Sequence, residues 1–494
     1  MQLYNTLSKK VEPFVSLSET IDPQDKQVKM YACGPTVYDY THIGHLRKYV
    51  MDDVLVRVLR HAGYDVKHVQ NITDVGHLVS DDDEGEDKME KGARKYGKTA
   101  WEVARTFEDY FWYSLDKMGV LRPTLSCRAT EHIQSQLEMV LALEKQGFTY
   151  VIPDDGVYFD TAKLERYGEL SGHDPRQAHR ESRVGEITGK RNPSDFALWK
   201  FERAGENRQM VWPSPWHPRS FPGWHIECSA MSVEHLGEQL DIHTGGVDHI
   251  AVHHANEIAQ SETATHKRPF AKFWVHHNFL RVDGEKMSKS LNNFYTIDDI
   301  LKKGYQPAAL RLLFLGSHYR SEQNFTFASL DAASTAWQKL AMMCVQLRHD
   351  RGEDDVLAES EQQNTVALAA QFEHDFFEAV ENDLDTPTAL AILWKMLKSD
   401  IASRQKYRLL LEFDRTLGLG LAGLQEADIA AFAPANQELD LLDLPKFLQD
   451  LFAAREAARA RKDFATADQI RAQFQEAGYE LIDRADGVVV QKKQ

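Results

Sequence analysis

The sequence predicts an α/β fold: a doubly wound, Rossmann-like parallel sheet split by an insertion, then an α-helical bundle and a small C-terminal domain. Three observations indicate this fold class. Apolar residues follow a strand–helix–strand pattern over residues 28–72. A second α/β pattern covers residues 217–270, after a stretch rich in Gly, Pro and charge. From Pro307 to about residue 430 the pattern is mostly helical.

The first half of the sheet is predicted from local patterns. Residues 28–33 (VKMYAC) form an apolar run that indicates a buried strand, and a turn follows at Gly34 and Pro35. Residues 45–63 carry apolar side chains at helical spacing and end on a glycine, as a helix does. Residues 65–72 (DVKHVQNI) fit a second strand. This order and spacing predict a parallel βαβ unit.

The later elements are predicted in the same way. An acidic run at residues 80–87 is typical of a solvated loop. Residues 98–118 and 131–147 each predict a helix, and the insertion that follows contains strand-like pieces such as GVYFD. Near the end, residues 444–478 predict two helices, followed by a short apolar tail, GVVVQ.

Composition narrows the class of protein. Hydrophobic residues make up 43% and charged residues 27%, which is typical of a soluble globular chain. No stretch approaches the roughly 20 apolar residues that span a bilayer, and the start, MQLYNTLSKKVEPF, has no apolar signal-peptide core, so we expect a cytoplasmic protein without a membrane partner. Four cysteines are too few for a disulfide scaffold. The net charge of −17 argues weakly against a nucleic-acid partner, but a local basic face can lie on an acidic protein.

A short histidine motif follows the first strand and turn. In His42-Ile43-Gly44-His45, the two imidazoles are three residues apart at the start of a helix. A helix N-terminus presents free N–H groups that bind anions such as phosphate, and the two imidazoles can donate hydrogen bonds to the same anion. Gly44 allows a nucleotide to approach the backbone closely.

A second motif, Lys286-Met287-Ser288-Lys289-Ser290, suits a mobile phosphate clamp. Its two lysines can neutralise the charge that builds on pyrophosphate as it leaves. In this order and in an α/β context, the two motifs resemble the HIGH and KMSKS signatures with which class I aminoacyl-tRNA synthetases bind ATP. The resemblance implies that Mg-ATP is a substrate, bound by His42, Gly44, His45, Lys286, Ser288 and Lys289.

A third constellation joins two cysteines, a histidine and a glutamate. Cys33 ends the first strand, where open α/β sheets bind ligands, and Cys228 lies in FPGWHIECSAMS. His253 and Glu257 are four residues apart and therefore share one helical face. Two thiolates, an imidazole and a carboxylate make a tetrahedral zinc set. His254 is the alternative imidazole; the four-residue spacing favours His253.

Longer segments of the sequence resemble the cysteinyl-tRNA synthetases over nearly the whole chain. These segments, which occur in that family's order, are CGPTVYDYTHIGH, NITDV, RNPSDFALWK, GWHIECSAMS, HHANEIAQSE and KMSKSLNNF. The resemblance implies one Zn²⁺ per chain on Cys33, Cys228, His253 and Glu257. It implies L-cysteine near Gly34, Thr73 and Trp224, the ATP ribose near Asp248, and catalytic roles for His42, His45, Lys286 and Lys289. The chain departs from the family pattern in NITDVGHLVSDDDEGEDK, where NITDVDDK is common, and in HHANE, where HHENE is frequent.

The resemblance also assigns the parts of the chain. We expect the first half of the catalytic domain at residues 1–130, a connective insertion at 131–216, the second half at 217–270, a linking segment at 271–329, a helical bundle at 330–437 and a tRNA anticodon-binding domain at 438–494. We expect this last domain to help read the anticodon stem; its basic residues, interleaved with acids, include Arg455, Arg459, Arg461, Lys462 and Arg471. An insertion of about 90 residues leaves no room for the large editing domains of some class I relatives.

The predicted reaction activates L-cysteine with ATP and transfers it to tRNA(Cys). Zinc would select the thiolate of cysteine over the hydroxyl of serine, which an apolar pocket separates by roughly 10²-fold at best. No dimerisation motif is visible, so we expect a monomer. Two alternatives remain: a ligase that joins activated cysteine to an amino-sugar, and an inactive RNA-binding paralogue. About 200 residues after Ser290 favour the synthetase over the first, and intact motifs favour it over the second.

Overall fold

The computed structural model describes residues 1–76, 87–172, 189–288, 291, 293–350, 359–429, 438–439, 441, 444–461, 463–477, 479–484 and 487–492. These residues form two compact units: residues 1–337 with 347–422, and residues 338–346 with 423–494. The predicted acidic loop lies outside the described residues except for Asp87. Within the part of the chain that the structure describes, no helix is long and apolar enough to cross a membrane.

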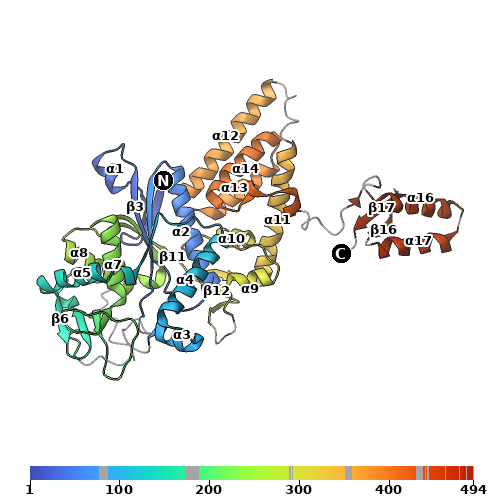
Figure 1. Ribbon diagram of the computed structural model, residues 1–494. Coiled ribbons are helices and arrows are strands. Elements are labelled where there is room, and N and C mark those ends of the chain that lie inside the picture. The colour runs from blue at the N-terminus through green and yellow to red at the C-terminus, as the bar shows by residue number, and fades with distance from the viewer. Residues whose placement is uncertain are drawn as a thin grey trace. The chain divides into compact units, whose positions relative to one another are not determined.

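A five-stranded parallel sheet forms the centre of the first unit (Figure 1). Its strands, in spatial order, are β5 (Leu125–Arg128), β4 (Asp65–Ile72), β3 (Gln27–Ala32), β10 (Leu240–Gly246) and β11 (Ala271–His277). The chain builds the sheet outward in both directions from β3 and β10, so the strand order reverses between these two strands. Open α/β sheets bind their ligands at such a point, beyond the carboxyl ends of the strands. The predicted doubly wound α/β fold is confirmed.

Helices cover both faces of this sheet (Figure 1). On one side lies α2 (Ile43–His61), the predicted first helix, together with α4 (Ala100–Lys117), the predicted helix over 98–118. On the other side α5 (Ile133–Lys145), α7 (Trp224–Leu236) and α8 (His253–Thr265) pack together. Thr99 and Glu102 form a capping box at the start of α4, which explains why that helix begins where it does.

Shorter elements complete the periphery of the sheet. They are β1 (Gln2–Asn5), β2 (Lys10–Pro13), α1 (Leu17–Ile21) and α3 (Lys88–Tyr96). Helix α3 was not predicted from the sequence. Asp87 caps it by accepting hydrogen bonds from the backbone N–H groups of Met89 and Glu90.

The insertion carries its own antiparallel sheet. Its strands are β6 (Thr149–Ile152), β7 (Gly156–Phe159), β8 (Phe196–Phe201) and β9 (Ser220–Pro222), paired in that order. The strand-like GVYFD of the sequence is β7. Strand β9 lies beyond residue 216 and leads directly into α7, so the insertion ends where a ligand-bearing helix begins.

After β11 the chain forms a small three-stranded sheet and then becomes helical. The sheet contains β12 (Leu280–Val282), β13 (Glu285–Lys286) and β14 (Gln323–Phe325), with α9 (Ile297–Lys302) and α10 (Pro307–Leu315) between β13 and β14. The predicted helices follow as α11 (Phe327–Asp350), α12 (Glu359–Glu381), α13 (Thr386–Lys398) and α14 (Ser403–Leu417). Helices α12, α13 and α14 pack against one another, with the rings of Phe376 and Phe413 stacked at 3.8 Å.

The C-terminal part of the second unit is a small α+β domain. It contains α15 (Glu426–Ile429), β15 (Glu438–Leu439), α16 (Lys446–Ala460), α17 (Phe464–Glu476), β16 (Tyr479–Arg484) and β17 (Gly487–Lys492). The tail GVVVQ is therefore the strand β17, paired antiparallel with β16. A core of Leu448, Ile470, Phe474, Leu481 and Val490 joins the helices to the sheet.

The five basic residues named in the sequence analysis differ in their contacts. Arg455 is buried and binds Asp483, which also pairs with Arg459. Arg471 donates a hydrogen bond to the backbone oxygen of Leu481. These three arginines therefore hold the domain together, whereas Arg461 is exposed and Lys462 lies outside the described residues.

Candidate functional site

A pocket of about 620 Å³ opens beyond the carboxyl ends of β3 and β10, at the reversal of strand order. It is lined from the starts of α2 and α7, the turn after β10, and strands β12 and β13. Eleven of the predicted site residues line it: Cys33, Gly34, His42, Gly44, His45, Thr73, Trp224, Cys228, Asp248, His253 and Lys286. Segments far apart in the sequence thus meet in one cavity.

The first histidine motif stands at the N-terminus of α2. His42 caps this helix, and its Nδ1 accepts a hydrogen bond from the backbone N–H of His45 at 3.3 Å. An imidazole that accepts at Nδ1 carries its proton on Nε2. The two rings stack with centroids 3.5 Å apart. The N-terminus of this helix and both imidazoles therefore meet at one corner of the pocket, an arrangement that is typical of anion sites.

Gly44 lies close to the ring of His42 and near the second signature motif. A Cβ atom at this position would lie 3.0 Å from the ring of His42 and 3.5 Å from Cε of Met287. Lys286 ends β13 and, with Met287, lines the pocket opposite α2. Ser288 lies just beyond the lining, and its backbone N–H donates to Oδ1 of Asn293 at 2.7 Å. Lys289 lies outside the described residues.

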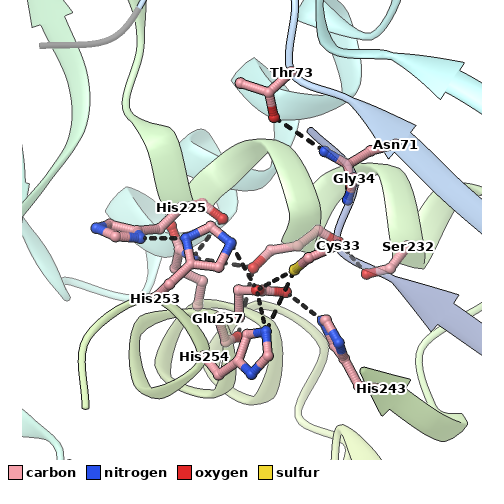
Figure 2. Close-up of polar contacts among 12 residues, drawn as sticks. Cys33, Gly34, Asn71, Thr73, His225, Ser232, His243, His253, His254 and Glu257 are labelled. Atoms are coloured by element: carbon pink, nitrogen blue, oxygen red, sulfur yellow. Dashed lines mark hydrogen bonds and ion pairs between the residues drawn. The ribbon is translucent and has the colours of Figure 1, made fainter. Parts of the chain in front are cut away.

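The four predicted metal ligands converge beside the pocket, and Cys33, Cys228 and His253 line it. Figure 2 shows three of the four, Cys33, His253 and Glu257. The ligand atoms of Cys33, Cys228, His253 and Glu257 all lie within 4.8 Å of one another, and all four side chains are buried. Cys33 follows β3, Cys228 lies on α7, and the other two lie one turn apart on α8. His253 Nε2 is 3.0 Å from Glu257 Oε1.

A second set of ligand atoms overlaps the first. Cys33 and Glu257 also lie within 4.8 Å of His243 and His254. His254 Nε2 is 3.3 Å from the sulfur of Cys33, and His243 Nε2 is 2.8 Å from Glu257 Oε2. The first set contains both thiols, which softer metals prefer. With a metal on the first set, His243 would orient Glu257 and His254 would orient the thiol of Cys33.

The electrostatics of the cluster suit a cation. Burial alone would raise the pKa of the Cys33 thiol, but hydrogen bonding with Cys228 and the nearby His254 hold it well below its usual range. The same hydrogen bond, together with burial, raises the pKa of Cys228. Burial lowers the pKa of His253, yet the Glu257 carboxylate and Cys33 outweigh this effect and raise it to about 10. Metal ligands bind in their deprotonated forms, so a divalent cation would replace these protons. The donors present therefore fit a zinc-class ion.

The predicted cysteine-binding residues surround this cluster. The backbone N–H of Gly34 donates to Oδ1 of Asn71 at 2.7 Å, and Nδ2 of Asn71 donates to Thr73 Oγ1 at 3.0 Å (Figure 2). The indole of Trp224 lies against His253, with ring centroids 4.4 Å apart. Asp248, in a short 3₁₀ turn after β10, lines the same pocket.

Sequence reasoning missed a charged network under the pocket. Lys48 donates to the backbone oxygen of Cys33 at 2.6 Å and pairs with Asp52 at 2.7 Å, and His277 lies 2.8 Å from the other oxygen of Asp52. Burial would raise the pKa of Asp52, but Lys48 and His277 hold it well below its usual range. The network ties α2 and β11 to the end of β3. Charged residues four apart on an otherwise apolar helix were its only signal in the sequence.

Comparison with known proteins identifies the parts of the chain. Residues 20–335 match the family model "tRNA synthetases class I (C) catalytic domain", and residues 442–490 match "Cysteinyl-tRNA ligase anticodon binding domain". The fold is similar to that of Mycobacterium tuberculosis methionyl-tRNA synthetase in complex with methionyl-adenylate. That likeness has a TM-score of 0.55 and 16% sequence identity, and it covers 80% of this chain and 90% of that one.

Similar full-length relatives agree with both matches. Cysteine–tRNA ligase 1 of Burkholderia lata is 43% identical over 99% of this chain and 96% of its own length. The cysteine–tRNA ligase of Zymomonas mobilis is 40% identical over 97% of this chain and 95% of its own. The chain belongs to the cysteine–tRNA ligase family of class I aminoacyl-tRNA synthetases.

Proposed function

We propose that the chain joins L-cysteine to tRNA(Cys) in two steps, with a zinc ion held by Cys33, Cys228, His253 and Glu257. In the first step the cysteine carboxylate attacks the α-phosphorus of Mg-ATP, which forms cysteinyl-adenylate and releases pyrophosphate. In the second, the terminal adenosine hydroxyl of the tRNA takes the cysteinyl group and releases AMP. One observation carries the proposal: three members of a buried Cys-Cys-His-Glu set line the same pocket as both signature motifs.

The choice of amino acid would be made at the floor of the pocket. When bound there, zinc favours a thiolate over the neutral hydroxyl of serine, because it can deprotonate a coordinating thiol. Thr73, Trp224 and the backbone of Gly34 would hold the rest of the substrate above the cluster. This arrangement orients the cysteine carboxylate toward the phosphate corner, and orientation alone can supply several kcal/mol of a barrier, roughly 7–11 in the best cases.

Activation would depend on charge stabilisation at the opposite wall. His42 and His45, with the N-terminus of α2, would donate hydrogen bonds to phosphate oxygens. Lys286 and Lys289 would neutralise the charge that grows on the leaving pyrophosphate, with Ser288 contributing a donor of the same loop. Asp248 would accept from the ribose hydroxyls. No side chain forms a covalent intermediate in this scheme.

Transfer to tRNA would use the C-terminal domain. Its match to an anticodon-binding domain supports tRNA as the acceptor and disfavours the amino-sugar ligase, which has no use for such a domain. Since the product would supply protein synthesis, we propose a cytoplasmic location. We retain the expectation of a monomer.

Cysteine-dependent exchange of pyrophosphate into ATP, followed by charging of bulk tRNA, tests the proposal. The wild-type chain should perform both reactions and contain about one tightly bound zinc. Cys228→Ser should lose most of that zinc and most of the exchange activity, because a thiolate is replaced by a weak neutral ligand. Cys127→Ala is the matched control, since it removes a buried thiol that belongs to neither ligand set. Full zinc in Cys228→Ser would reject the ligand assignment, and exchange without tRNA charging would reject the acceptor.

A further inference from the structure

A second group of metal-ligating side chains lies away from the pocket, where the start of α5 meets the end of α7. It consists of His132, Glu234 and His235, and their ligand atoms all lie within 4.8 Å of one another. The Nε2 atoms of the two histidines are 2.7 Å apart, and His132 Nε2 is 3.8 Å from Oε1 of Glu234. None of these residues lines the pocket described above.

The protonation of His132 is set by its other nitrogen. His132 Nδ1 lies 2.7 Å from the backbone oxygen of Arg128, and a carbonyl oxygen can only accept. The Nδ1 atom therefore carries the proton, and the lone pair of Nε2 points toward His235. Histidines that bind metals are commonly held in this way, with the far nitrogen donating to a backbone carbonyl.

The spacing of the three ligand atoms is close to what a metal requires. Ligands about 2.0–2.1 Å from a tetrahedral zinc ion lie about 3.3 Å from one another. The two imidazole nitrogens would need to separate by about 0.6 Å, and the carboxylate oxygen to approach by about 0.5 Å. Glu234 has 44% of its side chain exposed, so its carboxylate can move at little cost. The alternative is a simple hydrogen bond between two neutral imidazoles, which the experiment below distinguishes.

The group is open to solvent on one side, and Lys67 lies next to it, donating a hydrogen bond to the backbone oxygen of His235 at 2.7 Å. The group borders a groove of about 490 Å³ that is also lined by Glu131 and Glu138, and no lysine or arginine is among the described residues of its lining. Three protein ligands leave at least one coordination position for water. Such a site binds less tightly than the closed Cys-Cys-His-Glu set.

We propose that His132, Glu234 and His235 form a second, exchangeable site for a divalent zinc-class ion. An ion bound there would link the first turn of α5 to the last turn of α7. Helix α7 also carries Cys228, about 10 Å away along the helix axis from His235. The inference is independent of the proposed function, because it rests on a different set of ligands.

Zinc titration of the full chain tests the second site. The wild-type chain should hold the tight equivalent as purified and take up one further, weaker equivalent in isothermal titration calorimetry, which makes two in all. His132→Ala and His235→Ala should each weaken the second equivalent by about tenfold or more, and Cys228→Ser should remove only the first. Co²⁺ gives an independent readout: the second equivalent should add visible absorption bands without a thiolate charge-transfer band, because its ligands contain no sulfur.

His374→Ala is the matched control. His374 forms a similar group with Asp375 and Glu378, but it supplies a single imidazole, and its pair with Glu378 is 70% and 72% exposed. This variant should bind zinc like the wild type. A single equivalent in the wild-type chain would overturn the proposal, and so would a second equivalent that both His132→Ala and His235→Ala retain. A failure of the proposed function would appear separately, as loss of the first equivalent's dependence on Cys228.

Discussion

Replacing Gly34 by alanine should disrupt both the predicted cysteine-binding pocket and the neighbouring set of metal ligands. Gly34 follows Cys33 directly, and it passes so close to the end of β4 that a Cβ atom would lie 1.6 Å from the backbone oxygen of Asn71 and 2.6 Å from its carbonyl carbon. These are backbone atoms of a buried residue, so no flexible side chain can move aside. The clash must be relieved by shifting one chain segment against the other.

The size of that shift determines the expected effect. An ordinary contact begins near 3.4 Å, so the two segments must move apart by about 1.8 Å. The hydrogen bond from the Gly34 N–H to Asn71 would be lost, and Cys33 would move relative to Cys228 and Glu257. Misplacement of reacting groups by about 1 Å can cost roughly 10²-fold in rate, so we expect at least a 100-fold loss of cysteine-dependent pyrophosphate exchange. Overpacking should also destabilise the fold by about 1–3 kcal/mol.

Two measurements on the same preparation check this reasoning. Zinc content should fall well below one equivalent, and the rate of exchange should fall with it. Gly423→Ala is the control, because a Cβ atom there meets no other heavy atom within 4 Å. If folded Gly34→Ala kept full zinc and exchanged pyrophosphate within about twofold of the wild type, the close approach of β3 and β4 would not be what positions the site.

Three further predictions concern stability and the C-terminal domain. Burial lowers the pKa of His68 from 6.5 to about 4. Between these two pH values the unfolded chain binds more protons than the folded chain. The free energy of unfolding should therefore fall as the pH falls, by about 3 kcal/mol in total. Urea unfolding at several pH values should show this loss in the wild type, and a steady difference between wild type and His68→Gln across pH 7 to 4 would contradict it. Asp53→Asn should cost about 3–5 kcal/mol in thermal unfolding, because it removes the carboxylate that lies 2.5 Å from the fully buried guanidinium of Arg311. A cost below about 1 kcal/mol would refute this. A folded chain truncated after residue 443 should keep pyrophosphate exchange but lose most tRNA charging, and full charging would exclude an anticodon role for the C-terminal domain.

Much of the fold follows from patterns within short stretches of sequence. The apolar run at residues 28–33, the helical periodicity that follows and the alternation at 65–72 correspond to β3, α2 and β4. The pairing of strands with one another was harder to predict from the sequence. GVVVQ was predicted only as an apolar tail, because the strand β17 depends on its partner β16 and on a core shared with two helices.

In the site, too, some residues could be predicted from the sequence and others could not. A metal set of Cys33, Cys228, His253 and Glu257 was predicted from their donor types together with the resemblance to class I synthetases, because thiolates, imidazoles and carboxylates are characteristic zinc donors. Nothing in the spacing indicated that His243 would lie 2.8 Å from Glu257, or that Lys48 would hold the backbone of Cys33. The arginines at 455, 459 and 471 were expected to help read tRNA, yet their partners are an aspartate and a backbone oxygen of their own domain.

The sequence by itself determined the chemistry that is available: the donors, the two phosphate-binding motifs and the order of strands and helices. Those properties depend on residue type and on neighbours within a few positions. Only the tertiary structure decided which side chains orient the ligands, how closely Gly34 approaches Asn71, and that His132 meets His235 across two helices. These contacts join residues tens to hundreds of positions apart, and close packing, rather than local preference, brings their atoms to within 3 Å of one another.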